Sequence, residues 1–312
     1  MRQHGEISPQ RYAVSFSDRR GFRQAYVHHR SGDANRPALL LVHGWPESKR
    51  IYWKVIDPLV EAGFDVIVPD LRGFGDSGPA PDGFYDTVAH VHDMRSLVCD
   101  ELGYDSVVAV GGDMGGPVVQ ELALRFPELV DRMVLFNSPL PYDKERMSGI
   151  VGTRAPREAA DYFMRQGLEA DTLARELADE TSRRNYIATF YTSRFWAHPG
   201  TFTPDEVDFH TEPFADAAVL RASFGGYESV FDPAKRSEPS IMGRNESTPT
   251  LVLFGPSDHV IYPAFDRMAE QVFARCVGPF LLRDCGHFVP WEAPRQFVTG
   301  LTAFCSDLLK GV

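Results

Sequence analysis

The sequence predicts an α/β protein: a mostly parallel, twisted sheet with helices on both faces and a helical lobe inserted into it. Three observations support this fold class. Short segments rich in Val, Leu and Ile alternate with segments of helical periodicity through the first half of the chain. The strand signal stops after residue 141, where helical spacing replaces it, and it resumes at residue 250. Nearly continuous apolar segments are typical of strands that helices cover on both faces.

Each strand of the predicted sheet is a short apolar segment. Strand–helix alternation implies parallel pairing through right-handed crossovers. Two earlier segments, 12–18 and 22–29, alternate apolar and polar residues and predict an antiparallel hairpin at one edge. A final helix follows the last strand. The predicted strands are residues 38–44, 64–71, 107–112, 133–138, 250–256 and 278–284, of which the first four are expected to be covered on both faces, and the helices between these four are residues 51–63, 86–103 and 117–130.

The inserted lobe divides the chain into three parts. Residues 142–231 are rich in Arg, Glu, Ala and aromatic residues at helical spacing, and 237–249 has the Pro, Ser, Gly and Asn content of a linker. We therefore predict an α/β core in residues 1–141, a helical cap in 142–240, and the second part of the core in 241–312.

Composition excludes several classes of function. The 312 residues are 43% hydrophobic, enough for a large core, and carry a net charge of −11 with no basic run. This balance argues against binding to nucleic acid or to an anionic membrane. No apolar stretch approaches the ~20 residues of a membrane span, and the first residues resemble no signal peptide. The four cysteines and ten histidines lack metal-ligand spacing. The sequence thus predicts a cytoplasmic protein with free thiols and no metal or cofactor.

A glycine pattern after the second buried strand resembles a dinucleotide-binding fingerprint. Gly73, Gly75 and Gly78 have the GxGxxG spacing. That fingerprint needs a helix to begin at once, so that its N-terminus can bind the pyrophosphate. Pro79 and Pro81 follow instead and block such a helix. We therefore predict no nucleotide binding.

The third buried strand ends in GGDMGG, residues 111–116. Small residues around Asp113 allow a sharp turn from strand to helix that raises the central side chain above the sheet. This is the geometry of a nucleophile elbow, which usually carries serine. The alternative is that Asp113 only caps the following helix, as aspartate often does.

An elbow needs an acid and then a histidine later in the chain, each after a strand. Asp258 and His287 have this order and placement. A second acid, Asp284, is too close to His287 in sequence to orient its ring from another loop. His259 is an alternative base, next to Asp258. The three together favour Asp113 as nucleophile over the helix-cap interpretation.

The first buried strand ends in HGWP, residues 43–46. The glycine lets the backbone turn the N–H of Trp45 inward. Together with the N–H of Met114, this group would form an oxyanion hole. We also predict that His43 and Pro46 contact the substrate.

These segments resemble those of a known family. The chain resembles the α/β-hydrolase superfamily over essentially its full length, and HGWP, DLRGFGDS, GGDMGG and CGHFVPWEAP look like the epoxide hydrolase branch. Relatives with an aspartate nucleophile include the haloalkane and fluoroacetate dehalogenases. The resemblance implies an α/β-hydrolase fold with a cap. It also implies hydrolysis of a small hydrophobic epoxide to a vicinal diol, and leaves a homodimer open.

The resemblance also implies two cap tyrosines that bind the epoxide oxygen. Tyr227, in FGGYESV, matches the second. For the first, ADYFMRQG offers Tyr162, although the usual position is nearer Ala159. Tyr186 and Tyr191 are the alternatives.

The elbow segment differs from those of the related families in three ways. Haloalkane dehalogenases usually carry tryptophan, and fluoroacetate dehalogenases arginine, where this chain has Met114. Both departures weaken the dehalogenase alternative. Epoxide hydrolases usually have histidine where Gly112 stands.

The aspartate itself favours displacement at saturated carbon. Serine attacking such a carbon would form an ether that water cannot cleave, whereas a carboxylate forms an ester that water can hydrolyse. Opening an epoxide and expelling a halide both fit. A ligand receptor that uses the cap without catalysis is a further alternative, although it would not need all three polar residues. An esterase is disfavoured because no serine occupies an elbow.

Overall fold

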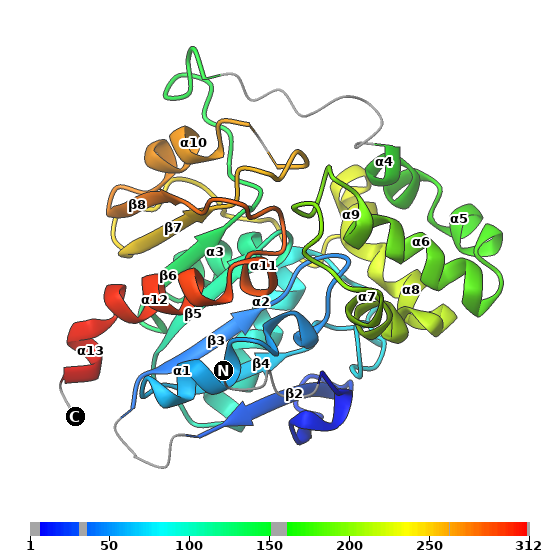
Figure 1. Ribbon diagram of the computed structural model, residues 1–312, viewed down its shortest axis with the longest axis horizontal. Coiled ribbons are helices and arrows are strands. Elements are labelled where there is room, and N and C mark those ends of the chain that lie inside the picture. The colour runs from blue at the N-terminus through cyan, green and yellow to red at the C-terminus, as the bar shows by residue number, and fades with distance from the viewer. Residues whose placement is uncertain (1–6, 31–35, 151–160, 262, 311–312) are drawn as a thin grey trace.

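The computed structural model describes residues 7–30, 36–150, 161–261 and 263–310 (Figure 1). Its centre is one eight-stranded sheet in the order β1-β2-β4-β3-β5-β6-β7-β8. The strands from β3 to β8 pair in parallel, while β1 and β2 are antiparallel at one edge, as predicted. The strands are β1 (Val14–Ser17), β2 (Gln24–His29), β3 (Ala38–Val42), β4 (Asp65–Pro69), β5 (Val107–Gly112), β6 (Val130–Phe136), β7 (Thr250–Phe254) and β8 (Cys276–Leu281).

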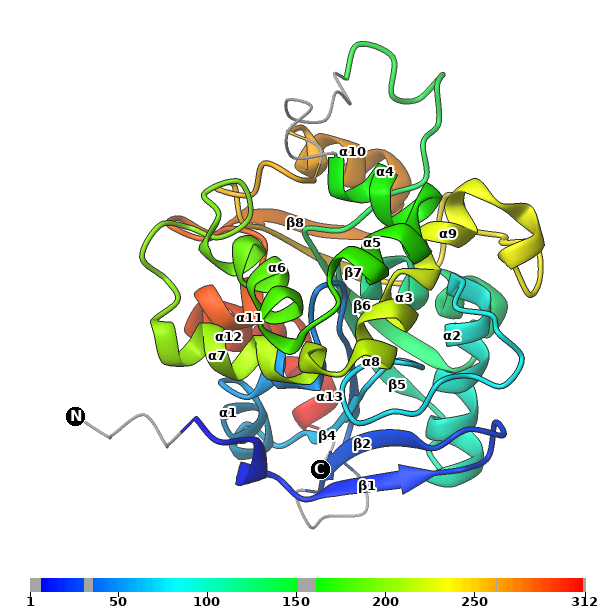
Figure 2. The same ribbon diagram turned by 90° about the vertical axis from the view of Figure 1, so that its right-hand side faces the viewer.

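Helices cover both faces of the sheet and bury its centre. Every residue of β3, β4, β5 and β7 is buried, which explains why these strands are almost continuously apolar. In Figure 2, α1 and α12 lie on one side of the sheet, and α2 and α3 on the other. The fold class is therefore confirmed. The core helices are α1 (Ile56–Glu61), α2 (Thr87–Arg95), α3 (Gly115–Arg125), α10 (Phe265–Val272), α11 (Val289–Glu292), α12 (Pro294–Phe304) and α13 (Ser306–Lys310).

Several element boundaries differ from the prediction. The helix expected over 86–103 is α2 followed by a π-helical segment, η3 (Ser96–Glu101). The helix expected over 51–63 divides into a 3-10 turn, η2 (Lys49–Tyr52), and α1. The last strand was expected over 278–284, but β8 ends at Leu281. Its pairing partner β7 ends at Phe254, opposite Leu281, so the ladder has no further neighbour.

The described residues of 142–240 form helices and loops, in agreement with the helical periodicity of this segment. These helices gather beyond one end of the sheet (Figures 1 and 2). The exact limits of the cap, at 142 and 240, stay predictions. The helices are α4 (Asp161–Leu168), α5 (Ala170–Glu176), α6 (Glu180–Thr192), α7 (Pro204–Thr211), α8 (Ala217–Ser223) and α9 (Gly225–Phe231), with the short turns η5 (Glu212–Ala215) and η6 (Pro233–Lys235).

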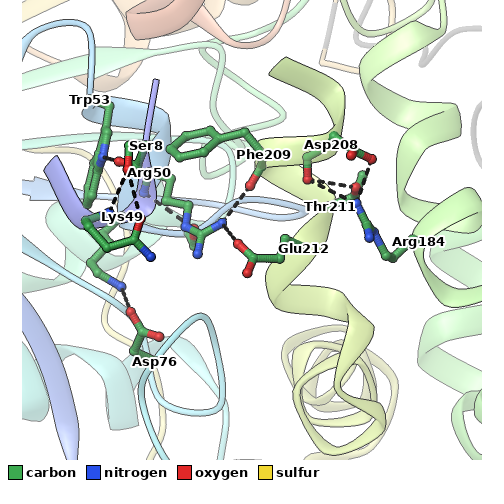
Figure 3. A network of polar contacts seen from close by, with 12 residues as sticks. Ser8, Lys49, Arg50, Trp53, Asp76, Arg184, Asp208, Phe209, Thr211 and Glu212 are labelled. Carbon is green, nitrogen blue, oxygen red and sulfur yellow. Dashed lines mark hydrogen bonds and ion pairs between the residues drawn. The ribbon is translucent and has the colours of Figure 1, made fainter. Parts of the chain in front are cut away.

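A buried arginine joins the cap to the core (Figure 3). Arg50, on η2, donates to the carbonyl of Phe209 at 2.7 Å and to Oε2 of Glu212 at 2.6 Å. Its neighbour Lys49 forms ion pairs with Asp70 and Asp76, each at 2.5 Å. The segment after HGWP thus connects the cap with the loop that follows β4.

The glycine-rich loop after β4 has a structural role. The carboxylate of Asp70 accepts the backbone N–H groups of Lys49 and Asp76, both at 2.8 Å. A Cβ at Gly75 would collide with this carboxylate. The next helix, α2, begins only at Thr87. Gly75 is therefore required by its packing on Asp70. No helix begins directly after the GxGxxG segment, where a pyrophosphate would bind.

The described residues contain no helix with the length and apolar character needed to cross a membrane. All four cysteines are unpaired.

Candidate active site

Asp113 lies on the tight turn between β5 and α3. Its φ of 42° is in the left-handed region, which is uncommon for a residue with a side chain. The flanking glycines are required by space: a Cβ at Gly115 would meet the carbonyl of Val42, and one at Gly111 would meet the carbonyl of Gly115. No side chain caps the start of α3 by a hydrogen bond. The geometry therefore supports the nucleophile-elbow interpretation over the helix-cap alternative.

The structure brings Asp113, Asp258 and His287 together. His287 Nδ1 lies 2.7 Å from Asp258 Oδ2, and its Nε2 lies 3.3 Å from Asp113 Oδ2. Asp258 also accepts the N–H of Val260 at 2.7 Å, which fixes the orientation of its carboxylate. The alternative acid Asp284 is exposed and lies on the turn after β8. The alternative base His259 is exposed too, and its backbone N–H donates to Phe195.

His287 lies between two carboxylates in a buried place. Burial by itself would lower the pKa of His287, but the Asp258 carboxylate and then Asp113 raise this pKa well above its ordinary value. His287 is 1% exposed. The two carboxylates therefore favour the protonated form of His287 in the resting site.

The two oxygens of Asp113 have different surroundings. Oδ1 accepts the backbone N–H of Trp45 at 2.8 Å, whereas Oδ2 faces His287. The first oxygen is thus in the position predicted for an oxyanion hole. Met114 follows Asp113 directly, and its N–H as the second donor stays a prediction.

His43 and Pro46 are absent from the described residues that line the cavity in front of Asp113. The ring of His43 is fully buried, with Nδ1 2.8 Å from the carbonyl of Gly44 and Nε2 accepting the N–H of Leu71 at 3.0 Å. The carbonyl of Pro46 accepts the hydroxyl of Tyr191 at 2.6 Å. These contacts hold the loop in place, and the predicted substrate contact of both residues gains no support.

Two cap tyrosines pack edge to face in the wall of the cavity. The rings of Tyr162, on α4, and Tyr227, on α9, are 5.8 Å apart and nearly perpendicular. Both line the cavity with Asp113. Burial raises the pKa of Tyr227 well above its ordinary value, and the neighbouring Tyr162 and Asp113 raise it further. The phenol of Tyr227 is therefore protonated and can donate a hydrogen bond.

The alternative tyrosines have other positions. The hydroxyl of Tyr191 donates to the Pro46 carbonyl, and its ring stacks on Phe288 at 4.6 Å. Tyr186 accepts the side-chain amide of Gln166 at 2.9 Å and is absent from the described cavity lining. The geometry thus favours Tyr162 over both. Ala159 lies outside the described residues.

The cavity in front of Asp113 has a volume of about 280 Å³. Its wall is mostly apolar, as in pockets that bind small organic molecules. Both the core and the cap contribute side chains to this wall. The apolar members include Met114, Val118, Phe163, Val230, Met242 and Ile261.

Asn137, which sequence reasoning missed, connects the three loops of the site. It follows β6 with a φ of 35°, and its carbonyl accepts the N–H of Asp113 at 2.9 Å. Its side-chain amide donates to Asp258 Oδ2 at 2.9 Å and to the carbonyl of Gly255 at 3.0 Å, while its Oδ1 accepts the N–H of Gly255 at 2.8 Å. The position after a buried strand was the available signal, since other site residues share it.

Glu292, at the end of the CGHFVPWE segment, holds the histidine loop. It accepts the N–H groups of Gly286 and Phe288, on either side of His287, at 2.9 and 2.8 Å. It also accepts the N–H of His198 at 2.7 Å. Nothing in the local sequence distinguishes this carboxylate from a surface glutamate at the end of a helix.

Glu47, directly after HGWP, is a second missed carboxylate. It is 3% exposed, and its Oε2 accepts the N–H of Gly44 at 2.6 Å. Burial raises the pKa of Glu47 to about 7, against a smaller lowering by His287. Its charge therefore changes near neutral pH, within the electrostatic reach of the base.

The fold and this site together define the class of the protein, which is that of the α/β hydrolases. The family model for the alpha/beta hydrolase fold matches residues 37–294, and the chain belongs to that family.

Relatives within this family include proteins named as epoxide hydrolases. The chain is 29% identical over 286 residues to the soluble epoxide hydrolase of Corynebacterium sp. (strain C12), covering 89% of this chain and 91% of that protein. It is 32% identical over 282 residues to epoxide hydrolase 4 of Mus musculus, covering 90% and 75% of the two chains.

Solved structures named as epoxide hydrolases have the same fold. The epoxide hydrolase CorEH without ligand has a TM-score of 0.77 at 24% identity, covering 95% of this chain and 99% of its own. The juvenile hormone epoxide hydrolase of the silkworm Bombyx mori also has a TM-score of 0.77, at 17% identity, covering 96% and 80% of the two chains.

Proposed function

We propose that the protein hydrolyses an epoxide to a vicinal diol through a covalent ester on Asp113. One observation carries this proposal. One oxygen of the Asp113 carboxylate accepts the backbone N–H of Trp45, and the other is directed at the imidazole of His287. This carboxylate faces a cavity whose wall includes two tyrosines. The relatives named as epoxide hydrolases, which match most of the chain, support the same activity.

The first step opens the ring. Oδ2 of Asp113 attacks one ring carbon, so that a carbon–oxygen bond forms and the bond from that carbon to the epoxide oxygen breaks. The leaving alkoxide needs a proton. A phenol of pKa ~10 can supply it, and Tyr227 or Tyr162 is placed to do so. The products of this step are an ester on Asp113 and a tyrosinate.

The second step depends on the change of charge at Asp113. The ester is neutral, so one of the carboxylates that raise the pKa of His287 is removed. The imidazolium then loses its proton and neutralises the tyrosinate. Neutral His287 can now take a proton from water, whose oxygen attacks the ester carbon. The Trp45 N–H stabilises the charge that develops on Oδ1. When the ester bond breaks, the proton that remains on the attacking oxygen passes to the leaving alkoxide, so the diol is released and the carboxylate and the imidazolium are restored.

The dehalogenase alternative is weaker because a halide needs N–H donors. The described residues that line the cavity include no tryptophan, arginine or asparagine side chain, and the only ring N–H groups among them belong to His90 and His259. The indole N–H of Trp45 already donates to Ser223 Oγ at 3.1 Å. A hydrophobic epoxide also suits the apolar wall. A cytoplasmic location, a homodimer and the lack of a cofactor stay predictions.

Oxygen isotopes test the covalent step. With enzyme in excess over a single dose of epoxide in ¹⁸O-water, the diol should carry no heavy oxygen and the Asp113 peptide should gain one ¹⁸O atom. Mass spectrometry of both products gives the result. Heavy oxygen in the diol after this first turnover, with an unlabelled Asp113 peptide, would mean that water attacks the epoxide directly. Release of halide from chloro- or bromoalkanes without epoxide turnover would favour a dehalogenase.

A further inference from the structure

His90 is a buried polar side chain that the proposed reaction does not use. It lies on α2, is 2% exposed, and lines the same cavity as Asp113. Within the described part of the chain, neither of its ring nitrogens has a partner at hydrogen-bond geometry. Buried polar groups are nearly always paired, because an unpaired one loses its hydration without compensation. A binding site for a polar group of a ligand would supply the missing partner.

The imidazole of His90 is neutral. Burial lowers its pKa well below the ordinary value, and the positive charge of the nearby Arg72 lowers it further. A neutral imidazole carries one N–H donor and one nitrogen acceptor. It therefore suits an uncharged group and gives no attraction to a carboxylate or a phosphate.

Both halves of this pair are without a partner at hydrogen-bond geometry among the described residues. The nitrogen that carries the lone pair needs a donor. The hydroxyl of Ser229, which also lines the cavity, already donates to the carbonyl of Gly226 at 2.7 Å. The group that completes His90 is therefore an O–H or N–H donor on the ligand.

We propose that His90 binds a hydroxyl group of the substrate, and that the preferred substrates are epoxides with a free hydroxyl at a distance from the ring. The inference rests on the proposed function, because the epoxide end is placed by Asp113 and the two tyrosines. The hydroxyl would lie at the α2 side of the cavity and the hydrocarbon between the two ends against Val118 and Phe163. His90 is then a residue that determines specificity and takes no part in the chemical steps.

Three epoxides of equal chain length test this assignment. One carries a terminal hydroxyl, the second its methyl ether, which accepts but cannot donate, and the third a terminal methyl group. Their dissociation constants are measured by calorimetry on the Asp113→Asn variant, which cannot form the ester. The hydroxyl compound should bind about tenfold more tightly than the ether, the ratio that one neutral hydrogen bond supports. Adding His90→Phe should remove this ratio.

Two further variants keep the test informative. His90→Gln retains a polar acceptor and should restore part of the preference, which a merely structural role for His90 would not predict. Thr87→Val changes a residue one turn earlier that lines the same cavity, and it should leave the ratio unchanged. Equal binding of alcohol and ether, or a ratio that survives His90→Phe, overturns the assignment. Turnover of the methyl-terminated epoxide by the unmodified enzyme tests the proposed function separately.

Discussion

The indole ring of Trp45 lies 5.4 Å from the phenol ring of Tyr162, and the two planes are only 6° apart. The backbone N–H of the same tryptophan donates to Asp113. The ring of Tyr227 meets Trp45 edge-on at 5.6 Å. One residue thus contacts the nucleophile through its backbone and both cap tyrosines through its side chain.

Trp45→Phe separates these two contacts. The backbone N–H remains, so stabilisation of the charge on Asp113 Oδ1 should persist, while both tyrosines lose the indole ring that they contact. We expect ring opening to slow by roughly tenfold or more, since a misplaced proton donor loses part of its typical contribution. Ester hydrolysis should change little. Single-turnover quenched-flow measurements of the ester and the diol separate the two steps, and equal losses in both would contradict this division.

His287→Gln should trap the ester. The variant still has Asp113 with an oxygen free to attack the epoxide, but it lacks the base that takes the proton from water. Intact-protein mass spectrometry after addition of substrate should therefore show a mass increase equal to that of the epoxide. The double variant His287→Gln/Asp113→Asn should show no increase. A stable adduct in that control would place the reactive group elsewhere.

Asn137→Ala tests the residue that joins the three loops. Removal of the amide leaves the buried N–H and carbonyl of Gly255 without this partner and takes a donor from Asp258. We expect the free energy of unfolding to fall by about 2–3 kcal/mol, the cost of unpaired buried polar groups, and kcat to fall as well. Urea titration and steady-state kinetics measure the two effects.

The neighbouring Ser138→Ala is a matched control for Asn137. Its hydroxyl donates to the Pro139 carbonyl at 3.0 Å and lies 3.4 Å from the backbone carbonyl of Asp113, but it contacts neither Asp258 nor His287 through a described hydrogen bond. It should keep most of the activity. An Asn137→Ala protein with normal kcat would show that Asp258 needs no support from this amide.

The residues that sequence reasoning found share a local signal. Asp113 and Asp258 follow the buried strands β5 and β7, and His287 follows the largely exposed edge strand β8. Parallel strands bring their carboxyl ends to one edge of the sheet. Trp45 follows β3 in the same way. For these positions, strand periodicity and the glycines around the elbow were sufficient, because the fold determines where the ends of the strands meet.

The missed residues depend on contacts between distant parts of the chain. Asn137 and Asp258 are 121 positions apart, and Glu292 contacts His198 over 94 positions. No local spacing marks such pairs. The choice of Tyr162 over Tyr186 has the same basis, since periodicity places both on amphipathic helices but does not tell which helix face meets the cavity. The π-helical turn after α2 is likewise invisible to a 3.6-residue period.

The raised pKa of Glu47 predicts that stability falls as pH rises, which is unusual for a carboxylate. The pKa of Glu47 is raised from 4.5 to about 7, so between these values the folded protein binds more protons at this site than the unfolded chain does. Stability from this group must therefore fall as pH rises from about 4.5 to about 7, and stay lower above that range. The total change is roughly 3 kcal/mol at most, at 1.36 kcal/mol per pKa unit.

Glu47→Gln isolates this contribution. Glutamine keeps an oxygen that can accept the Gly44 N–H but does not ionise, so its free energy of unfolding should rise relative to that of the parent as pH increases from 5 to 7.5. Urea titrations at several pH values give the difference. Glu61→Gln, on the exposed side of α1, should follow the parent curve. A Glu47→Gln stability curve parallel to that of the parent would contradict this prediction. It would mean that Glu47 ionises equally in the folded and the unfolded state, so that its burial against Gly44 does not raise its pKa.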